Sequence, residues 1–318
     1  MLRMMGHHRR RFARAGVLTL LLTFAATLGR SGAADATSLP GVSTVSTTVV
    51  ADAGPGAGFR RLVAARDSLY VVDARAQHVR RYILNGLPYA ELFTQVMRWR
   101  EGANGLIMGQ PLDLALNGER LNILDSLGSL WSYWGPTFGR LLVPLRLQSN
   151  QGTVVAVATR GSTLLLLDPS MREVWTYAPA GGGYDTSPRP LTARPLAFLS
   201  AATRLAVSRD ALFALSSDGT LDVLPWAYPD KPAHLRLASA ITGLWAGATS
   251  GAVFVATADE VALLASSGGV TWRATVQGLD GETIQDVAWS PAGRLYLLTA
   301  TRILLVTGHA PNPIDALT

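Results

Sequence analysis

Residues 110–126, QPLDLALNGERLNILDS, contain the pattern that decides the fold. An apolar run at 111–116 is followed by the dipeptide Asn117-Gly118 and by a second apolar run that ends at Asp125. Two strand-like runs separated by Asn-Gly are typical of a β-hairpin, because both residues tolerate the positive φ angles of a tight turn. The stretch therefore predicts two antiparallel strands joined by a turn at Asn117-Gly118.

The same pattern recurs after about residue 58. The second run of each unit ends in a polar residue, and these residues recur at spacings of 41–52: Asp73, Asp125, Asp168, Asp218, Asp259 and Thr301. The first, inner runs lie at 61–65, 111–116, 154–158, 204–208, 244–248 and 286–290. A period of 40–50 residues with several strands per unit is typical of a β-propeller. We expect an all-β chain with a six-bladed β-propeller over residues 59–308, followed by a tail at 309–318.

The repeat resembles the six-bladed propellers built from NHL-type repeats and their YWTD-like relatives. Residues 110–126 are similar to the consensus Pro-x-Gly-Ile-Ala-Val-Asp…Gly-x-Leu-Tyr-Val-Ala-Asp-Ser, and residues 69–82 and 285–298 are similar more loosely. The chain departs from the consensus in that the family's Gly after Pro is absent from this stretch. The resemblance implies that the inner runs border a central channel, where many propellers bind ligands or metals.

The last unit lacks a fourth, outer strand. Residues 42–50, VSTVSTTVV, are β-branched and lie in an N-terminal segment, 35–58, that belongs to no repeat. We expect this segment to pair as the outer strand of the final blade, which removes an exposed sheet edge. Residues 87–109, 178–195 and 225–234 are predicted to be long loops, and seven blades are possible if 87–109 and 178–199 contain further strands.

The net charge of +6 is concentrated at the N-terminus. Residues 1–34 carry six arginines and no acid, so the remainder of the chain is neutral. A basic segment, a 14-residue apolar run at 15–28 and the small residues at 32–34 predict a cleaved signal peptide and a secreted or extracytoplasmic protein. The general secretion route is favoured over the twin-arginine route, and an uncleaved leader would instead anchor the protein in the membrane. The absence of Cys excludes disulfides, Cys-zinc sites and a lipobox anchor.

Three charged residues are candidates for binding a ligand in the channel. Asp113 and Asp286 occupy matching places on inner runs, and Arg61 falls near the same place in the first unit. Such residues either hold a polar ligand or form ion pairs with one another. The repeated Asp73, Asp125 and Asp168 either form a ring of carboxylates or accept backbone N–H bonds in their own turns.

A second group of residues is a candidate for binding a partner. Residues 60–100 carry eight arginines against three acids, a local charge of +5, and Arg suits carboxylate or phosphate contacts. Aromatic residues in loops are typical anchors of interfaces. The candidates are Arg60, Arg80, Arg81, Arg98, Trp99, Arg100, Trp226 and Tyr228. The alternative is that these arginines form a solvated edge of the first blade and bind no partner.

These observations favour a monomeric, non-catalytic scaffold that binds a protein or polymeric partner, and that meets the membrane only through its signal peptide. No cofactor, catalytic residue, metal site or nucleic-acid partner is predicted. The alternative is a propeller enzyme, either a metal-dependent lactonase or lyase or a quinone-dependent sugar dehydrogenase. A bound ion or quinone beside Asp113 and Asp286 would favour the enzyme, and a channel filled by apolar side chains would favour the scaffold.

Overall fold

The computed structural model describes residues 41–84, 91–97, 109–134, 140–141, 145–146, 151–181, 183–229, 231–247, 249–265, 268–308 and 310–313. All of them belong to one compact unit, Leu39–Thr318. The predicted leader, and with it the cleavage prediction, lies outside the described residues. Among the described residues, no helix is long and apolar enough to cross a membrane.

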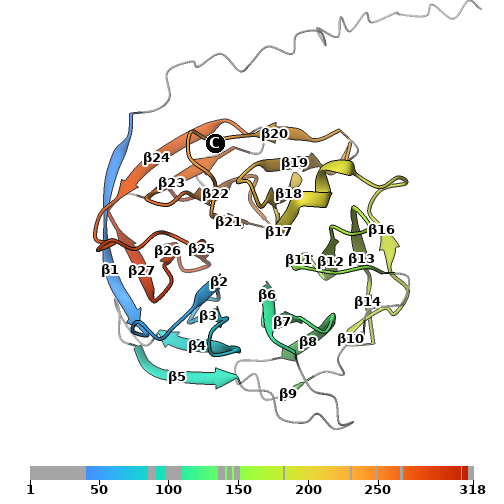
Figure 1. Ribbon diagram of the computed structural model, residues 1–318, viewed down its shortest axis with the longest axis horizontal. Helices are drawn as coiled ribbons and strands as arrows, with labels where there is room; N and C mark the ends of the chain where they lie inside the picture. The colour runs from blue at the N-terminus through green and yellow to red at the C-terminus, as the bar shows by residue number, and fades with distance from the viewer. Residues whose placement is uncertain are drawn as a thin grey trace, which may run out of the picture. The chain divides into compact units, whose positions relative to one another are not determined.

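Within this unit, the strands form small sheets that follow one another in chain order around a centre (Figure 1). The first sheet contains β2 (Phe59–Ala64), β3 (Ser68–Asp73), β4 (His78–Leu84) and β5 (Glu91–Met97). The second contains β6 (Pro111–Asn117), β7 (Arg120–Asp125), β8 (Ser129–Trp134), β9 (Arg140–Leu141) and β10 (Leu145–Arg146). The third contains β11 (Ala156–Arg160), β12 (Thr163–Asp168), β13 (Glu173–Tyr177) and β16 (Arg189–Pro190). The fourth contains β17 (Ala202–Val207), β18 (Ala211–Ser216), β19 (Leu221–Pro225) and β20 (Ala233–Leu235).

The remaining large sheet joins two sets of strands through the N-terminal strand. One set is β21 (Gly243–Ala246), β22 (Val253–Ala256), β23 (Glu260–Leu264) and β24 (Val270–Val276), and the other is β25 (Asp286–Ser290), β26 (Arg294–Leu298) and β27 (Arg302–Thr307). β1 (Ser43–Asp52) pairs antiparallel with β27 and parallel with β24. The prediction that residues 42–50 supply the outer strand of the last unit is therefore confirmed, and β1 also bonds to the preceding unit.

The hairpin predicted from residues 110–126 is present, with its turn shifted by one residue. Asn117 pairs with Arg120, so the two residues at the turn are Gly118 and Glu119. Gly118 has φ +57, which explains the glycine at this position.

The three segments predicted to be long loops contain strands, so that prediction is wrong for part of each. β5, β16 and β20 pair with the third strands of their sheets as outer strands. The segment after β13 also holds the short pair β14 (Pro179–Ala180) and β15 (Gly183–Tyr184), before the 3₁₀ turn η1 (Ala197–Ala201). The side chains of β16 and most of those of β20 are exposed, so these two strands show no apolar alternation.

The repeated aspartates that end the second strands hold each sheet together. Asp73, Asp125 and Asp168 are fully buried, and each accepts the backbone N–H of a glycine that precedes the first strand of its own sheet. The N–H to carboxylate distances are 3.1 Å for Gly58–Asp73, 2.9 Å for Gly109–Asp125 and 2.6 Å for Gly152–Asp168. Each carboxylate also accepts an N–H from the turn that follows it. The interpretation of these residues as acceptors of backbone bonds is confirmed.

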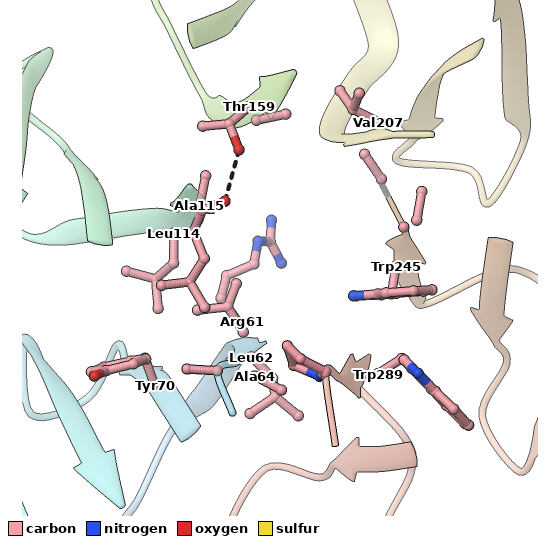
Figure 2. Close-up of a pocket in the computed structure, with 18 of the residues that line it drawn as sticks. Arg61, Leu62, Ala64, Tyr70, Leu114, Ala115, Thr159, Val207, Trp245 and Trp289 are labelled. Carbon is pink, nitrogen blue, oxygen red and sulfur yellow. Dashed lines mark hydrogen bonds between the residues drawn. The ribbon is translucent and has the colours of Figure 1, made fainter. Parts of the chain in front are cut away.

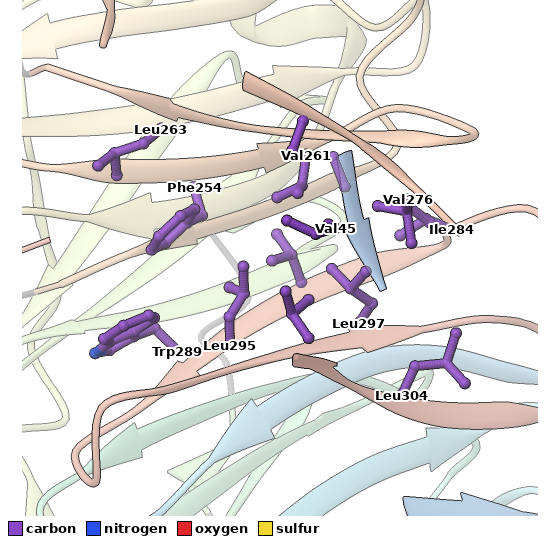
Figure 3. Packing of buried hydrophobic residues seen from close by; sticks show 14 of the residues in the cluster. Val45, Phe254, Val261, Leu263, Val276, Ile284, Trp289, Leu295, Leu297 and Leu304 are labelled. Carbon is purple, nitrogen blue, oxygen red and sulfur yellow. The ribbon is translucent and has the colours of Figure 1, made fainter. Parts of the chain in front are cut away.

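The hydrophobic core lies between neighbouring sheets. The largest cluster fills the space between β22–β24 and β25–β27, and Val45 of β1 packs into it (Figure 3). At its inner side the rings of Phe254 and Trp289 stack with centroids 5.5 Å apart. Burying side chains of this size stabilises the fold by roughly 1.5–3 kcal/mol each. The interfaces between sheets therefore hold the inner strands in place around the centre.

Candidate ligand site in the central cavity

The inner strands enclose a cavity of about 1020 Å³. Its lining comes from the first strand of every unit, namely β2, β6, β11, β17, β21 and β25. Figure 2 shows residues from these strands around the space, with Arg61 extending toward its middle. This cavity is a candidate site for a small molecule, because its volume lies at the upper end of the roughly 300–1,000 Å³ that such sites measure.

One side of the cavity carries two ion pairs that link different sheets. Arg61 on β2 places its Nε 3.1 Å from Oδ1 of Asp113 on β6. Oδ2 of Asp113 accepts the backbone N–H of Val157 on β11 at 2.8 Å. Asp113 thereby joins three successive sheets through its two oxygens.

The second ion pair connects sheets that are farther apart in the chain. Arg204 on β17 places Nη1 2.7 Å from Oδ1 of Asp286 on β25. Oδ2 of Asp286 accepts the N–H of Leu62 on β2 at 3.0 Å. A Cβ on Gly243 of β21 would lie 2.8 Å from the Cα of Asp286, so glycine permits the close approach of β21 to β25.

Burial controls the ionisation of these groups. It raises the pKa of Asp113 above its ordinary value, while the Arg61 guanidinium and the N–H of Val157 oppose the rise. It also lowers the pKa of Arg204 to about 10, although the carboxylate of Asp286 acts in the opposite direction. Arg204 therefore keeps its positive charge at neutral pH.

The rest of the cavity wall is largely apolar and aromatic. Trp289 is 7% exposed and stacks on the ring of Phe254. Trp245 is half-buried and contacts the same Phe254 ring. The hydroxyl of Thr159 also lies in the wall, but it donates to the carbonyl of Leu116 at 2.7 Å (Figure 2). The wall therefore offers mainly apolar contacts, and the half-buried Arg61 and Arg204 place their positive charges beside the two carboxylates.

All three predicted channel residues lie in this cavity. Arg61, Asp113 and Asp286 line it together with Arg204, which the sequence analysis did not include. A signal was present, since Arg204 begins the inner run 204–208 just as Arg61 begins the run 61–65. Whether these residues bind a ligand stays a prediction.

The predicted partner-binding residues of the first sheet are separated by the fold. Arg60 is exposed, whereas Arg80 is half-buried, pairs with Asp73 at 2.7 Å and lies over the ring of Phe59. Arg81 is 6% exposed and lines the central cavity, where it donates to the Ser68 hydroxyl. Arg80 and Arg81 therefore do not form part of an open basic edge. Arg98, Trp99 and Arg100 lie outside the described residues.

The two loop aromatics also differ in their environment. The indole N–H of Trp226 donates to the carbonyl of Ser208, and the guanidinium of Arg160 lies 4.0 Å from the centre of its ring. Tyr228 is 63% exposed, with the Lys231 ammonium 5.7 Å from its ring. Tyr228 is thus the more accessible of the two.

The described residues contain no group of three or more His, Cys, Asp or Glu side chains arranged to hold a metal ion. Asp113 and Asp286 also have both oxygens committed to Arg and backbone N–H donors. This donor set does not fit a metal held by these two carboxylates.

Comparison with known proteins identifies the architecture. No family model and no curated protein matches the chain. Solved structures do match: the RRP9 WD40 repeats have a TM-score of 0.58 at 10% identity, covering 82% of this chain and 96% of that chain. This fold is a β-propeller. A streptogramin B lyase (TM-score 0.55, 9% identity, 82% of this chain and 97% of that chain) and a nidogen/laminin complex (0.54, 12%, 74% and 85%) are similar in the same way.

The propeller expected from the sequence repeat is thereby confirmed. At identities of 9–12%, the likeness shows the fold of this propeller and leaves its function to be argued from its own residues.

Proposed function

We propose that this propeller is an exported, non-catalytic scaffold that binds a protein or polymeric partner on the outer side of the cytoplasmic membrane. The observation that carries the proposal is the set of hydrogen bonds and ion pairs made by Asp113 and Asp286, two acids of the inner strands. Each is bonded to an arginine and to a backbone N–H of another sheet. These carboxylates link sheets to one another, which is a structural role.

The enzyme alternative draws on one feature of the cavity. A channel filled by apolar side chains would have favoured the scaffold, and a cavity of about 1020 Å³ is instead present. Room alone does not supply a reaction, however, because a lactonase or lyase site of the kind considered needs several acidic or His ligands on inner strands. The committed oxygens of Asp113 and Asp286 therefore favour the scaffold.

The surface around Tyr228 is the partner-binding face that we favour. It combines an exposed aromatic ring with nearby cations, namely Lys231 beside Tyr228 and Arg160 over Trp226. Arg60 lies at the start of a first strand, and Tyr228 follows the end of a third strand. In an antiparallel sheet these positions lie at opposite ends, so one partner face holds only one of them.

Export of the scaffold rests on the basic and apolar segment at residues 7–28 and the small residues at 32–34. Sequencing the N-terminus of the exported protein tests this part of the proposal. A mature chain that begins near residue 35 is expected, and an intact Met1 would contradict it.

Partner binding is tested by cross-linking and co-purification from the extracytoplasmic fraction, with metal analysis of the same sample. The same partner should be recovered with wild type and with Asp113→Asn, and should be lost with Tyr228→Ala. Leu127→Ala is a matched control, because Leu127 is an equally exposed apolar residue at 68% exposure. A stoichiometric divalent ion in the sample would favour the enzyme, and recovery of the partner with Tyr228→Ala would contradict the proposed face.

A further inference from the structure

The two ion pairs in the cavity have more hydrogen-bond donors than acceptors. Each guanidinium carries five N–H groups. Arg61 donates through Nε to Asp113 and through Nη1 to the carbonyl of Arg60, and Arg204 donates through Nη1 to Asp286 and through Nη2 to the carbonyl of Gln285. Within the described part of the chain, these bonds account for two N–H groups of each guanidinium.

The carboxylates, in contrast, receive part of their hydrogen bonds from the backbone. Both oxygens of Asp113 and of Asp286 accept bonds, and the backbone donors Val157 and Leu62 each occupy one of them. Backbone N–H donors stabilise carboxylate charge without using the guanidinium groups. The remaining N–H groups of Arg61 and Arg204 are therefore available to a further acceptor.

These donors face a space whose lining is mostly apolar, although it also includes the charged residues Arg66, Asp67, Arg81 and Glu119. The side chain of Arg61 is 18% exposed and extends toward the middle of the cavity (Figure 2), and that of Arg204 is 13% exposed. Leu114, Trp245 and Trp289 belong to the same lining. An arginine in such a setting favours a charged, planar acceptor, because its N–H fork matches the two oxygens of a carboxylate.

We propose that the central cavity binds an organic carboxylate with an apolar body, the carboxylate accepting from Arg61 and Arg204 and the body lying against Trp245 and Trp289. This inference goes beyond the proposed function. It concerns a small ligand inside the channel, whereas the proposed function concerns a protein or polymeric partner at the surface. It requires no covalent step.

The experiment uses isothermal titration calorimetry on the full exported chain, with octanoate and 3-phenylpropionate as probes. Each should bind, and the methyl ester of each should bind about ten-fold more weakly or worse, because the ester lacks the negative charge. Acetate should bind at least about ten-fold more weakly than octanoate, because it has no apolar body. Absence of binding by both acids, or equal binding of acid and ester, would overturn the proposal.

A double variant assigns the binding to the arginine. Arg61→Gln with Asp113→Asn removes both charges of one pair, so no unpaired charge remains buried. It should weaken octanoate binding about ten-fold or more and leave binding of the ester unchanged. The control Arg209→Gln alters an exposed arginine paired with Asp210 and should bind as wild type does. Unchanged octanoate binding in the double variant would refute the assignment, and the acid–ester comparison on wild type decides the ligand class even if the variant does not fold.

Discussion

Nη1 of Arg204 lies 2.7 Å from Oδ1 of Asp286, although the two residues stand on β17 and β25, which are separated along the chain by the whole of the β21–β24 set. The same carboxylate accepts from Leu62 on β2. One buried side chain thus connects the fourth sheet, the last and the first. This relationship turns a row of separate sheets into a closed arrangement around the cavity.

Replacing Asp286 by Asn should destabilise the fold strongly. The substitution leaves the buried Arg204 guanidinium without its counter-charge, and losing one partner of a buried pair costs about 3–5 kcal/mol. Urea unfolding followed by tryptophan fluorescence measures the change. Asp218→Asn is the control, because Asp218 pairs with Arg236 on the exposed surface, and its stability should stay close to wild type. Equal effects of the two substitutions would contradict the role given to Asp286.

Gly109→Ala should disturb the hydrogen bond between the Gly109 N–H and Asp125, which holds the start of the second sheet to the end of its second strand. A Cβ at Gly109 would lie 2.7 Å from the Ser126 hydroxyl and 2.8 Å from Cγ of Leu127, next to the N–H bond from Gly109 to Asp125. Crowding of this kind costs roughly 1–3 kcal/mol. Gly56→Ala is a matched control, since a Cβ there would meet no atom within 4 Å. Thermal melts of both variants test the prediction, which fails if they agree.

The N-terminal strand should contribute directly to stability. Val45 of β1 is 4% exposed in the core cluster, whereas Val49 of the same strand is 45% exposed. We expect Val45→Ala to cost roughly 1–3 kcal/mol and Val49→Ala to have little effect. Circular dichroism melts give the comparison.

Removing residues 36–52 altogether should lower the melting temperature by many degrees, because the edges of β24 and β27 lose their partner. An unchanged melt of the shortened chain would show that β1 is dispensable.

The pH dependence of stability should contain a contribution from Glu282. Burial raises the pKa of Glu282, but hydrogen bonds from Thr299, Thr301 and Arg302 outweigh it and hold the pKa below the ordinary 4.5. The stabilisation is therefore fully present above pH 4.5 and is lost as the pH falls through the folded-state pKa. Glu282→Gln should reduce the loss of stability on acidification in this window, as measured by urea midpoints at several pH values.

Asp280→Asn provides the comparison for this experiment. Asp280 pairs with the same Arg302, but its side chain is 75% exposed. Its replacement should leave the acid limb of the stability curve almost unchanged. If the two variants changed the pH dependence equally, the effect would come from any loss of a partner of Arg302, and the specific role given to Glu282 would be contradicted.

The repeat explains which residues of the candidate site could be predicted from the sequence. Asp113 and Asp286 hold equivalent places in the second and the last unit, so their position on inner strands followed from the period alone. Arg204 holds a similar place, yet its importance depends on Asp286, 82 residues away. A pairing across the ring has no local signature, because it forms only when the ring closes.

The basic sector shows the opposite case. Arg80 and Arg81 count equally in a sum of charges, but neighbouring residues on a strand face opposite sides. Arg80 consequently reaches Asp73, and Arg81 enters the cavity wall. A charge count cannot separate such residues, since it ignores side-chain direction.

The sequence by itself determined the class of fold, the hairpin unit, its period and the strand that closes the last sheet. These features depend on local alternation, turn residues and repetition, which are written along the chain. Only the tertiary structure decided that Arg61, Asp113, Arg204 and Asp286 lie beside one cavity. It also decided that the adjacent Arg80 and Arg81 point to different surroundings. The physical reason is that closure of the ring fixes which side chains become buried together, and burial makes each charge require a partner.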